Sequence, residues 1–135
     1  MAFTTGIRVR FAETDAQGIA NNSVYLVWFE VARVEYLERH AGGYPALRER
    51  GVEALVIESH VRYREPARFD DRLTLHAGCR DVSGARFRFV YELERHGTPI
   101  ADGETQHAIV DATTFRPTRV PQWLADAIAA AEATA

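Results

Sequence analysis

The densest hydrophobic stretch of the chain runs from Ser23 to about His40 and predicts a helix. Its first three turns leave little polar face, because apolar side chains stand at Val24, Tyr25, Leu26, Val27, Trp28, Phe29, Val31, Ala32, Val34, Tyr36 and Leu37. A helix that is apolar on most sides must be covered by other elements. Asn21, Asn22 or Ser23 can cap its start, and Gly42-Gly43 is expected to end it.

Apolar and polar residues alternate with the period of a strand in five other segments. The first is Ile7 to Phe11, and the others follow Gly51, at about 55–64, 73–80, 87–94 and 100–114. Turn-forming residues at 82–84 and 96–99 separate the last three segments and predict antiparallel hairpins. Short helical character at 44–50 and an alanine-rich helix at 122–133 complete the pattern.

The order of these elements predicts an α+β fold, with an antiparallel curled sheet of about five strands packed against one long central helix. The length of 135 residues suits a single domain, residues 1–135. Element order alone leaves other α+β folds open.

Composition and charge exclude several classes of partner. The net charge of −3 gives no general attraction to nucleic acid or to an anionic membrane, and no apolar run is long enough to span a bilayer. The basic residues are all Arg, which a bias in genome composition explains better than a phosphate-binding role. The single cysteine, Cys79, cannot form an intramolecular disulfide, and it is in phase with buried strand positions. We therefore expect a structural thiol and a cytoplasmic protein.

The segment before the long helix carries the most chemical information. With Asp15 first and Gly18 fourth, Asp15-Ala-Gln-Gly18 has the residue preferences of a type I turn, and on the residues alone a simple connecting turn is the better interpretation. The turn nevertheless feeds a buried helix, whose first N–H groups have no partner within the helix. A carboxylate beside such N–H groups can attack, or activate water to attack, a carbonyl that they polarise.

The same segment resembles the signature of the 4-hydroxybenzoyl-CoA thioesterase family, which are hotdog-fold acyl-CoA thioesterases. The matching residues are Asp15, Gly18, Asn21-Asn22, Tyr25-Leu26 and Phe29-Glu30-Val31-Ala32-Arg33, with weaker matches at Tyr63-x-x-Pro66-Ala67, Asp70-Asp71 and 116–121. The resemblance implies a hotdog fold and hydrolysis of an acyl-CoA thioester to free acid and CoA. It assigns Asp15 as nucleophile or general base and the backbone N–H of Asn22 as the group that polarises the carbonyl.

Two departures from the family pattern narrow the mechanism. Many relatives have His-Val where this chain has Ile19-Ala20, and some have Tyr or His in place of Asn22. Asn22 can supply a backbone N–H but cannot act as an acid or base. The site must then work with one carboxylate and backbone amides. Because thiolate is a good leaving group, these can suffice.

Further site residues are expected from the resemblance and from position. Gly18, Asn21, Tyr25, Trp28 and His60 are predicted to contact substrate, although aromatic residues on a central helix are more often core and His60 more often an ordinary surface or interface residue. The family binds CoA phosphates at the subunit surface, and Arg86 and Arg88 are the preferred candidates, although a solvated sheet face carries the same pattern.

No metal site and no cofactor are expected, since the chain lacks metal-ligand spacings and Gly-rich phosphate loops. The family implies a homo-oligomer, dimer or tetramer, with sites at subunit interfaces. The alternative function is a non-catalytic acyl-thioester-binding hotdog protein, and an acyl-carrier protein could replace CoA as the carrier of the acyl group.

Overall fold

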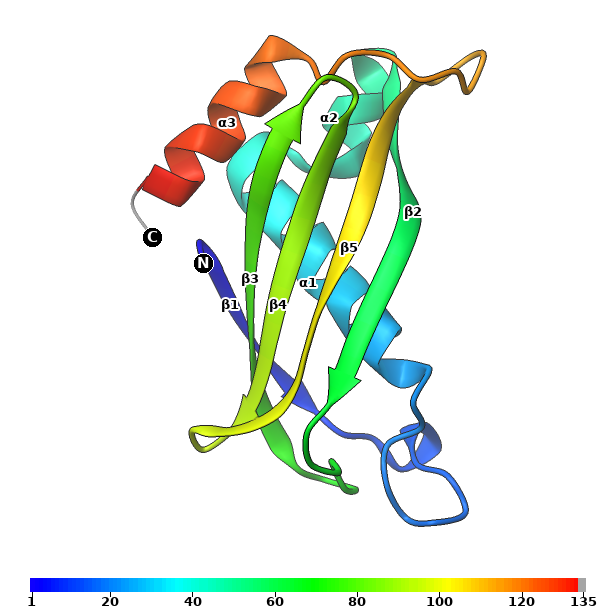
Figure 1. Cartoon of the computed structure of the whole chain (residues 1–135), viewed down its shortest axis with the longest axis vertical. Coiled ribbons are helices and arrows are strands. Elements are labelled where there is room, and N and C mark those ends of the chain that lie inside the picture. Colours follow the sequence, from blue (N-terminus) through cyan, green and yellow to red (C-terminus); the bar gives the residue numbers. More distant parts are fainter. Residues whose placement is uncertain (134–135) are drawn as a thin grey trace.

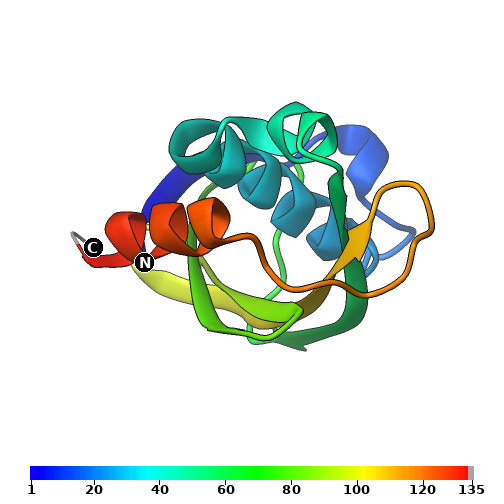
Figure 2. The ribbon, with the colours of Figure 1, turned by 90° about the horizontal axis from the view of Figure 1, so that it is seen from above.

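A five-stranded antiparallel sheet curls around one long helix (Figures 1 and 2). The computed structural model describes residues 1–133. The strands are β1 (Phe3–Arg8), β2 (Val52–Tyr63), β3 (Arg72–Ser83), β4 (Arg86–Arg95) and β5 (Thr98–Asp111), in the spatial order β1-β3-β4-β5-β2. This arrangement confirms the predicted α+β hotdog fold. It leaves β1 and β2 as the edges of the sheet.

The long helix α1 (Val24–Ala41) lies against the inner face of the sheet. One side of α1 is buried, and at its centre the Phe29 ring stacks on Tyr91 of β4 with ring centroids 4.1 Å apart. Gly42 ends the helix with a left-handed φ of 81°, as expected from the Gly-Gly pair. The prediction that α1 is covered holds for that side only, because Leu26, Val27 and Val31 remain exposed in the single chain.

Two shorter helices lie toward the same end of the fold, away from the Asp15 loop (Figure 1). Helix α2 (Gly43–Glu49) follows α1 directly, and α3 (Gln122–Ala133) lies beside β3 and α1 (Figure 1). Both were expected from the sequence. None of the helices in residues 1–133 is both long enough and apolar enough to cross a bilayer.

The central strands follow the predicted alternation. On β3 and β4 the inward positions are buried, namely Leu73, Leu75, Ala77, Cys79, Phe87, Phe89, Tyr91 and Leu93. The first hairpin turns at Gly84 and the second at His96 and Gly97, all with positive φ. Asp81, also with positive φ, lies where the pairing of β3 with β4 shifts register. Cys79 is buried as predicted, and burial raises the pKa of its thiol to about 12.

The first strand exists, but its bounds were predicted incorrectly. Alternation at Ile7 to Phe11 suggested a strand there, whereas β1 ends at Arg8 and Phe11 is 75% exposed. Val9 is buried and its amide donates to Asp71 O (3.0 Å), so the chain stays extended to that point. A single 3-10 turn, Phe11–Glu13, then bends the backbone and takes Phe11 out of the core.

A buried polar chain crosses the core from α1 to β5. The Arg33 guanidinium donates to Tyr91 OH (3.3 Å), Tyr91 OH and Thr105 Oγ1 are 2.7 Å apart, and Thr105 Oγ1 lies 2.7 Å from His107 Nε2. Burial and the nearby Arg33 charge lower the pKa of His107 to about 3. His107 is therefore neutral at pH 7 and can serve as a hydrogen-bonding group within the core.

Candidate active site

Asp15 opens a tight turn, as its spacing to Gly18 predicts. Its carboxylate Oδ1 accepts the Gln17 amide (2.8 Å), and its carbonyl accepts the Gly18 amide (3.0 Å). Gly18 has a φ of 77°, a left-handed conformation that glycine adopts without strain. The bond to Gln17 occupies one carboxylate oxygen and holds the side chain close to its own backbone.

The two arms of the Asp15 loop, residues 13–21, pair with each other and with a distant segment. The Asp15 amide donates to Ile19 O (2.9 Å), and the Asn21 amide donates to Glu13 O (2.8 Å). The Ala20 amide donates to Ala67 O (2.7 Å), beyond the end of β2. These bonds fix the Asp15 turn against both its own base and the 64–68 segment.

Asn21 makes the hydrogen bonds that fix the backbone just before α1. Its side-chain Oδ1 accepts the Ser23 amide (3.0 Å) and the Ser23 hydroxyl (2.9 Å), and its carbonyl accepts the Val24 amide (3.0 Å). Ser23 is the N-cap of α1 but makes no side-chain cap bond, and the Asn21 side chain instead holds Ser23 from two residues earlier. Within residues 1–133 the neighbouring Asn22 amide donates no hydrogen bond, so it is available to an acceptor.

A pocket of about 370 Å³ brings Asp15 and Asn22 together. It lies between the Asp15 loop, the start of α1 and the end of β2, and is lined by Asp15, Gln17, Ile19, Ala20, Asn22, Tyr25, Tyr63, Arg64, Glu65 and Pro66. Asp15 and Asn22 thus line the same pocket, together with apolar, aromatic and charged residues.

Two tyrosines form the aromatic wall of this pocket. The rings of Tyr25 and Tyr63 meet edge to face with centroids 5.0 Å apart, and the Tyr63 hydroxyl donates to Asn22 O (2.9 Å). Burial raises the pKa of Tyr25, so its phenol stays protonated at neutral pH. Tyr25 lines the pocket and can shape it but is unsuited to act as a base, and its contact with substrate stays a prediction.

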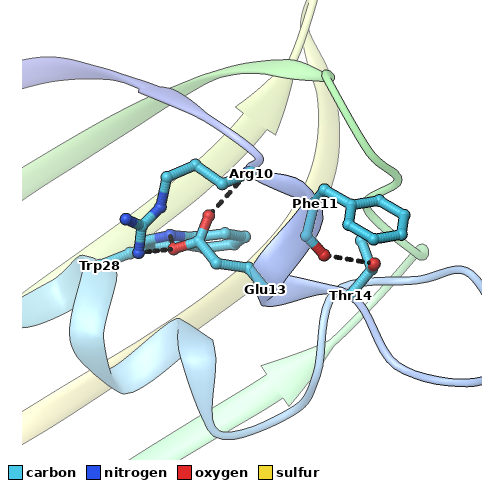
Figure 3. A network of polar contacts seen from close by, with 5 residues as sticks. All are labelled: Arg10, Phe11, Glu13, Thr14 and Trp28. Atoms are coloured by element: carbon cyan, nitrogen blue, oxygen red, sulfur yellow. Dashed lines mark hydrogen bonds and ion pairs between the residues drawn. The ribbon is translucent and has the colours of Figure 1, made fainter.

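Trp28 does not line this pocket. It is 3% exposed, and its indole Nε1 donates to Glu13 Oε2 (3.1 Å) on the 3-10 turn that precedes the Asp15 loop (Figure 3). Its ring packs against Tyr25, with centroids 5.0 Å apart. Trp28 thus lies one contact behind the pocket wall, in agreement with the alternative that aromatics on the central helix belong to the core.

The other predicted contacts lie elsewhere in the chain. His60 lines a hollow of about 670 Å³ on the outer face of the sheet, between β2, β4 and β5. Arg86 begins β4, at the end of the sheet opposite the Asp15 loop (Figure 1). Arg88 is engaged by Asp81 and Glu104, each at 2.8 Å. A single chain therefore does not bring His60, Arg86 or Arg88 to the pocket.

Seven pocket residues were not predicted as site residues: Gln17, Ile19, Ala20, Tyr63, Arg64, Glu65 and Pro66. The signal for Tyr63 was present, since Tyr63-x-x-Pro66-Ala67 belongs to the resemblance. Arg64 lines the pocket and donates to Asp102 Oδ2 (2.8 Å). It is therefore the arginine that could contact a phosphate of a ligand in this pocket. No group of three or more His, Cys, Asp or Glu gathers to hold a metal ion within residues 1–133.

Comparisons with known proteins identify the family of the chain. The family model described as "Thioesterase-like superfamily" matches residues 9–128. A provisionally named esterase of Aquifex aeolicus is 34% identical over 82% of this chain and 86% of its own. An acyl-CoA thioesterase of Haemophilus influenzae is 30% identical over 89% of each chain.

A solved structure titled DHNA-CoA thioesterase, from Staphylococcus aureus, superimposes with a TM-score of 0.86 at 26% identity, over 96% of this chain and 90% of that one. The match of the family model extends over the Asp15 loop, the central helix and all the strands except β1. The chain belongs to the thioesterase-like superfamily.

Proposed function

We propose that this protein hydrolyses acyl-CoA thioesters to the free acid and CoA, in the cytoplasm, with Asp15 and the Asn22 amide as the reacting groups. The observation that carries the proposal is the pocket of about 370 Å³, which both residues line. The names of relatives in the same superfamily support the class of reaction.

The arrangement suits thioester chemistry. The thioester carbonyl oxygen accepts the free Asn22 N–H, which lies at the positive end of the α1 dipole and stabilises the developing oxyanion. Asp15 either attacks the carbonyl carbon or takes a proton from a water that attacks it. In both routes the C–S bond breaks and the sulfur leaves as the CoA thiolate. If Asp15 attacks directly, water then cleaves the mixed anhydride.

The remaining wall of the pocket would contact the acyl and pantetheine parts. Tyr25 and Tyr63 offer aromatic surface and hydroxyl groups, and Arg64 offers a cation. Gly18 and Asn21 act through the backbone by shaping the turn and the helix start. Arg86, Arg88 and His60 can reach a substrate only if another subunit brings them to its site.

A thiol-release assay tests the reaction. Aromatic, short-chain and long-chain acyl-CoAs and an acyl-carrier-protein thioester are incubated with the protein and Ellman's reagent, and we expect rapid thiol release from at least one of them. Cys79 will not contribute, because it is 2% exposed and its pKa of about 12 keeps it protonated. If no thioester in the panel is cleaved but acyl-CoA binds in calorimetry, the non-catalytic binding protein is the correct function.

We also propose that the protein forms a homo-oligomer, a dimer or tetramer, through the β2 edge of the sheet. β2 has twelve residues and is an edge strand, and its Val56 and Ile57 are 46% and 42% exposed. Leu26, Val27 and Val31 add exposed apolar surface on α1. A long edge strand that exposes apolar side chains and has no partner is unusual in a monomer.

Sedimentation velocity is expected to give at least twice the mass of one chain. Ile57→Lys should shift the distribution toward monomer, because it places a charge on the exposed edge. Phe69→Lys, which alters a side chain of 56% exposure outside β2, serves as the matched control and should leave assembly unchanged. A monomer at all concentrations would contradict the proposed assembly.

A further inference from the structure

Glu13 is a buried carboxylate that the proposed reaction does not use. It is 7% exposed, and both of its carboxylate oxygens are occupied. Oε1 accepts the Arg10 amide (2.8 Å), while Oε2 accepts Trp28 Nε1 (3.1 Å) and the Arg10 guanidinium (3.4 Å) (Figure 3). A carboxylate removed from water is costly unless its oxygens are hydrogen-bonded, and here they are.

The exposed ion pair is the weaker part of this arrangement. The Arg10 side chain is 73% exposed, so its attraction to Glu13 is screened by solvent. The two short contacts instead come from groups with fixed positions, a backbone amide and an indole N–H on α1. Glu13 thereby connects the 3-10 turn before the Asp15 loop to the second turn of the central helix.

The backbone of Glu13 makes a further connection. Its carbonyl accepts the Asn21 amide (2.8 Å), which closes the base of the Asp15 loop. Asp15 follows Glu13 by two residues, and Asn22 follows Asn21 by one. Glu13 thus lies at the point where the arm that carries Asp15 and the arm that carries Asn22 meet.

Trp28 extends this connection around the pocket. Its ring contacts Tyr25, the Tyr25 ring contacts Tyr63, and the Tyr63 hydroxyl donates to the Asn22 carbonyl. From Glu13 a continuous series of contacts therefore runs behind the pocket and returns to Asn22. Loss of the Glu13 carboxylate would free the Asp15 arm from α1 and leave the Trp28 N–H without its acceptor.

We propose that Glu13 is a positioning residue, whose carboxylate, bound to Trp28 and to the Arg10 amide, sets the position of Asp15 relative to the Asn22 amide. This inference rests on the proposed thioesterase reaction. Because reactivity depends steeply on the alignment of the reacting groups, displacement by a fraction of an ångström is enough to lower turnover.

Steady-state kinetics of Glu13→Ala with the best substrate tests the role. We expect kcat to fall by roughly 10-fold to 10²-fold. KM should change little, because the residues that line the pocket are retained. Glu30→Ala removes an exposed carboxylate from α1 and is the matched control, with kcat expected to be unchanged. Trp28→Phe removes the donor of the same hydrogen bond. The double variant Glu13→Ala/Trp28→Phe should therefore have a kcat close to that of Glu13→Ala alone.

The decisive comparison repeats Glu13→Ala in an Asp15→Asn protein. If Glu13 acts through Asp15, the residual turnover of Asp15→Asn should change by less than about 3-fold when Glu13 is also replaced. A merely structural role would lower turnover by the same factor in both backgrounds, and that result would overturn the inference. Unchanged kcat in Glu13→Ala would do so as well.

These outcomes separate the inference from the function on which it rests. If Asp15→Asn lowers turnover but Glu13→Ala does not, only the positioning role is wrong. If Asp15→Asn retains full turnover, Asp15 is not a reacting group. The positioning role of Glu13 is then wrong as well. If Glu13→Ala does not fold, the Trp28→Phe pair of measurements, with and without Asp15→Asn, decides the question in the same way.

Discussion

Replacing Asp15 with asparagine is expected to lower thioester turnover by ~10²-fold or more while the protein still folds and binds acyl-CoA. The asparagine Oδ1 can still accept the Gln17 amide, so the turn that begins at Asp15 is retained. The substitution removes the negative charge, and with it the only group of the Asp15–Asn22 segment that can attack or take a proton. The rate of the chemical step should therefore fall far more than the affinity for acyl-CoA.

Three measurements on Asp15→Asn separate chemistry from binding and folding: kcat by thiol release, the acyl-CoA dissociation constant by calorimetry, and the thermal midpoint. Asp126→Asn, an exposed carboxylate on α3 distant in sequence from the pocket, is the control and should match the unsubstituted protein in all three. Retention of full turnover by Asp15→Asn would show that another group carries the reaction. A loss of acyl-CoA binding equal to the loss of turnover would instead make Asp15 a binding residue.

The central part of the fold could be predicted because local and global signals agree there. Buried and more exposed residues alternate along most of β3 and β4, and tight turns join β3, β4 and β5, so most of their register follows from short-range information. The bounds of the first strand could not be predicted in this way, because local and global signals disagree there. Its alternation extends through Val9, but Glu13 binds the Arg10 amide and bends the chain before Phe11 can continue the pattern.

Only those residues of the candidate site that lie close together in the sequence could be predicted. Asp15 and Asn22 are seven residues apart and a turn connects them, so their proximity could be inferred. Tyr63 lies 41 residues after Asn22 in the sequence and lines the pocket because β2 pairs with β5. No local pattern in the sequence reveals that pairing. Glu13 looks like an ordinary surface carboxylate in the sequence, and only the fold brings Trp28 to it.

Substitution of Gly103 by alanine is expected to destabilise the protein by about 3 kcal/mol, which for a chain of this size lowers the thermal midpoint by roughly 10 °C. Gly103 lies on β5 between Tyr91 of β4 and Val61 of β2. A Cβ there would lie 2.3 Å from His60 O and 2.7 Å from Phe29 Cε2. The first atom belongs to the backbone of a paired strand, and the second to a fully buried ring stacked on Tyr91, so neither can move cheaply.

Gly6→Ala is the matched control for Gly103→Ala. Gly6 also lies within a strand, but no heavy atom is within 4 Å of its Cβ position, and its φ is not in the left-handed region. Its midpoint should stay close to that of the unsubstituted protein, because alanine there also restricts the unfolded chain. Both variants are compared at one protein concentration, since assembly makes the midpoint concentration-dependent. Equal midpoints for Gly103→Ala and Gly6→Ala would mean that α1 can withdraw from the sheet at Gly103 at little cost. In that case the Phe29–Tyr91 contact would not fix the distance between the central helix and the sheet.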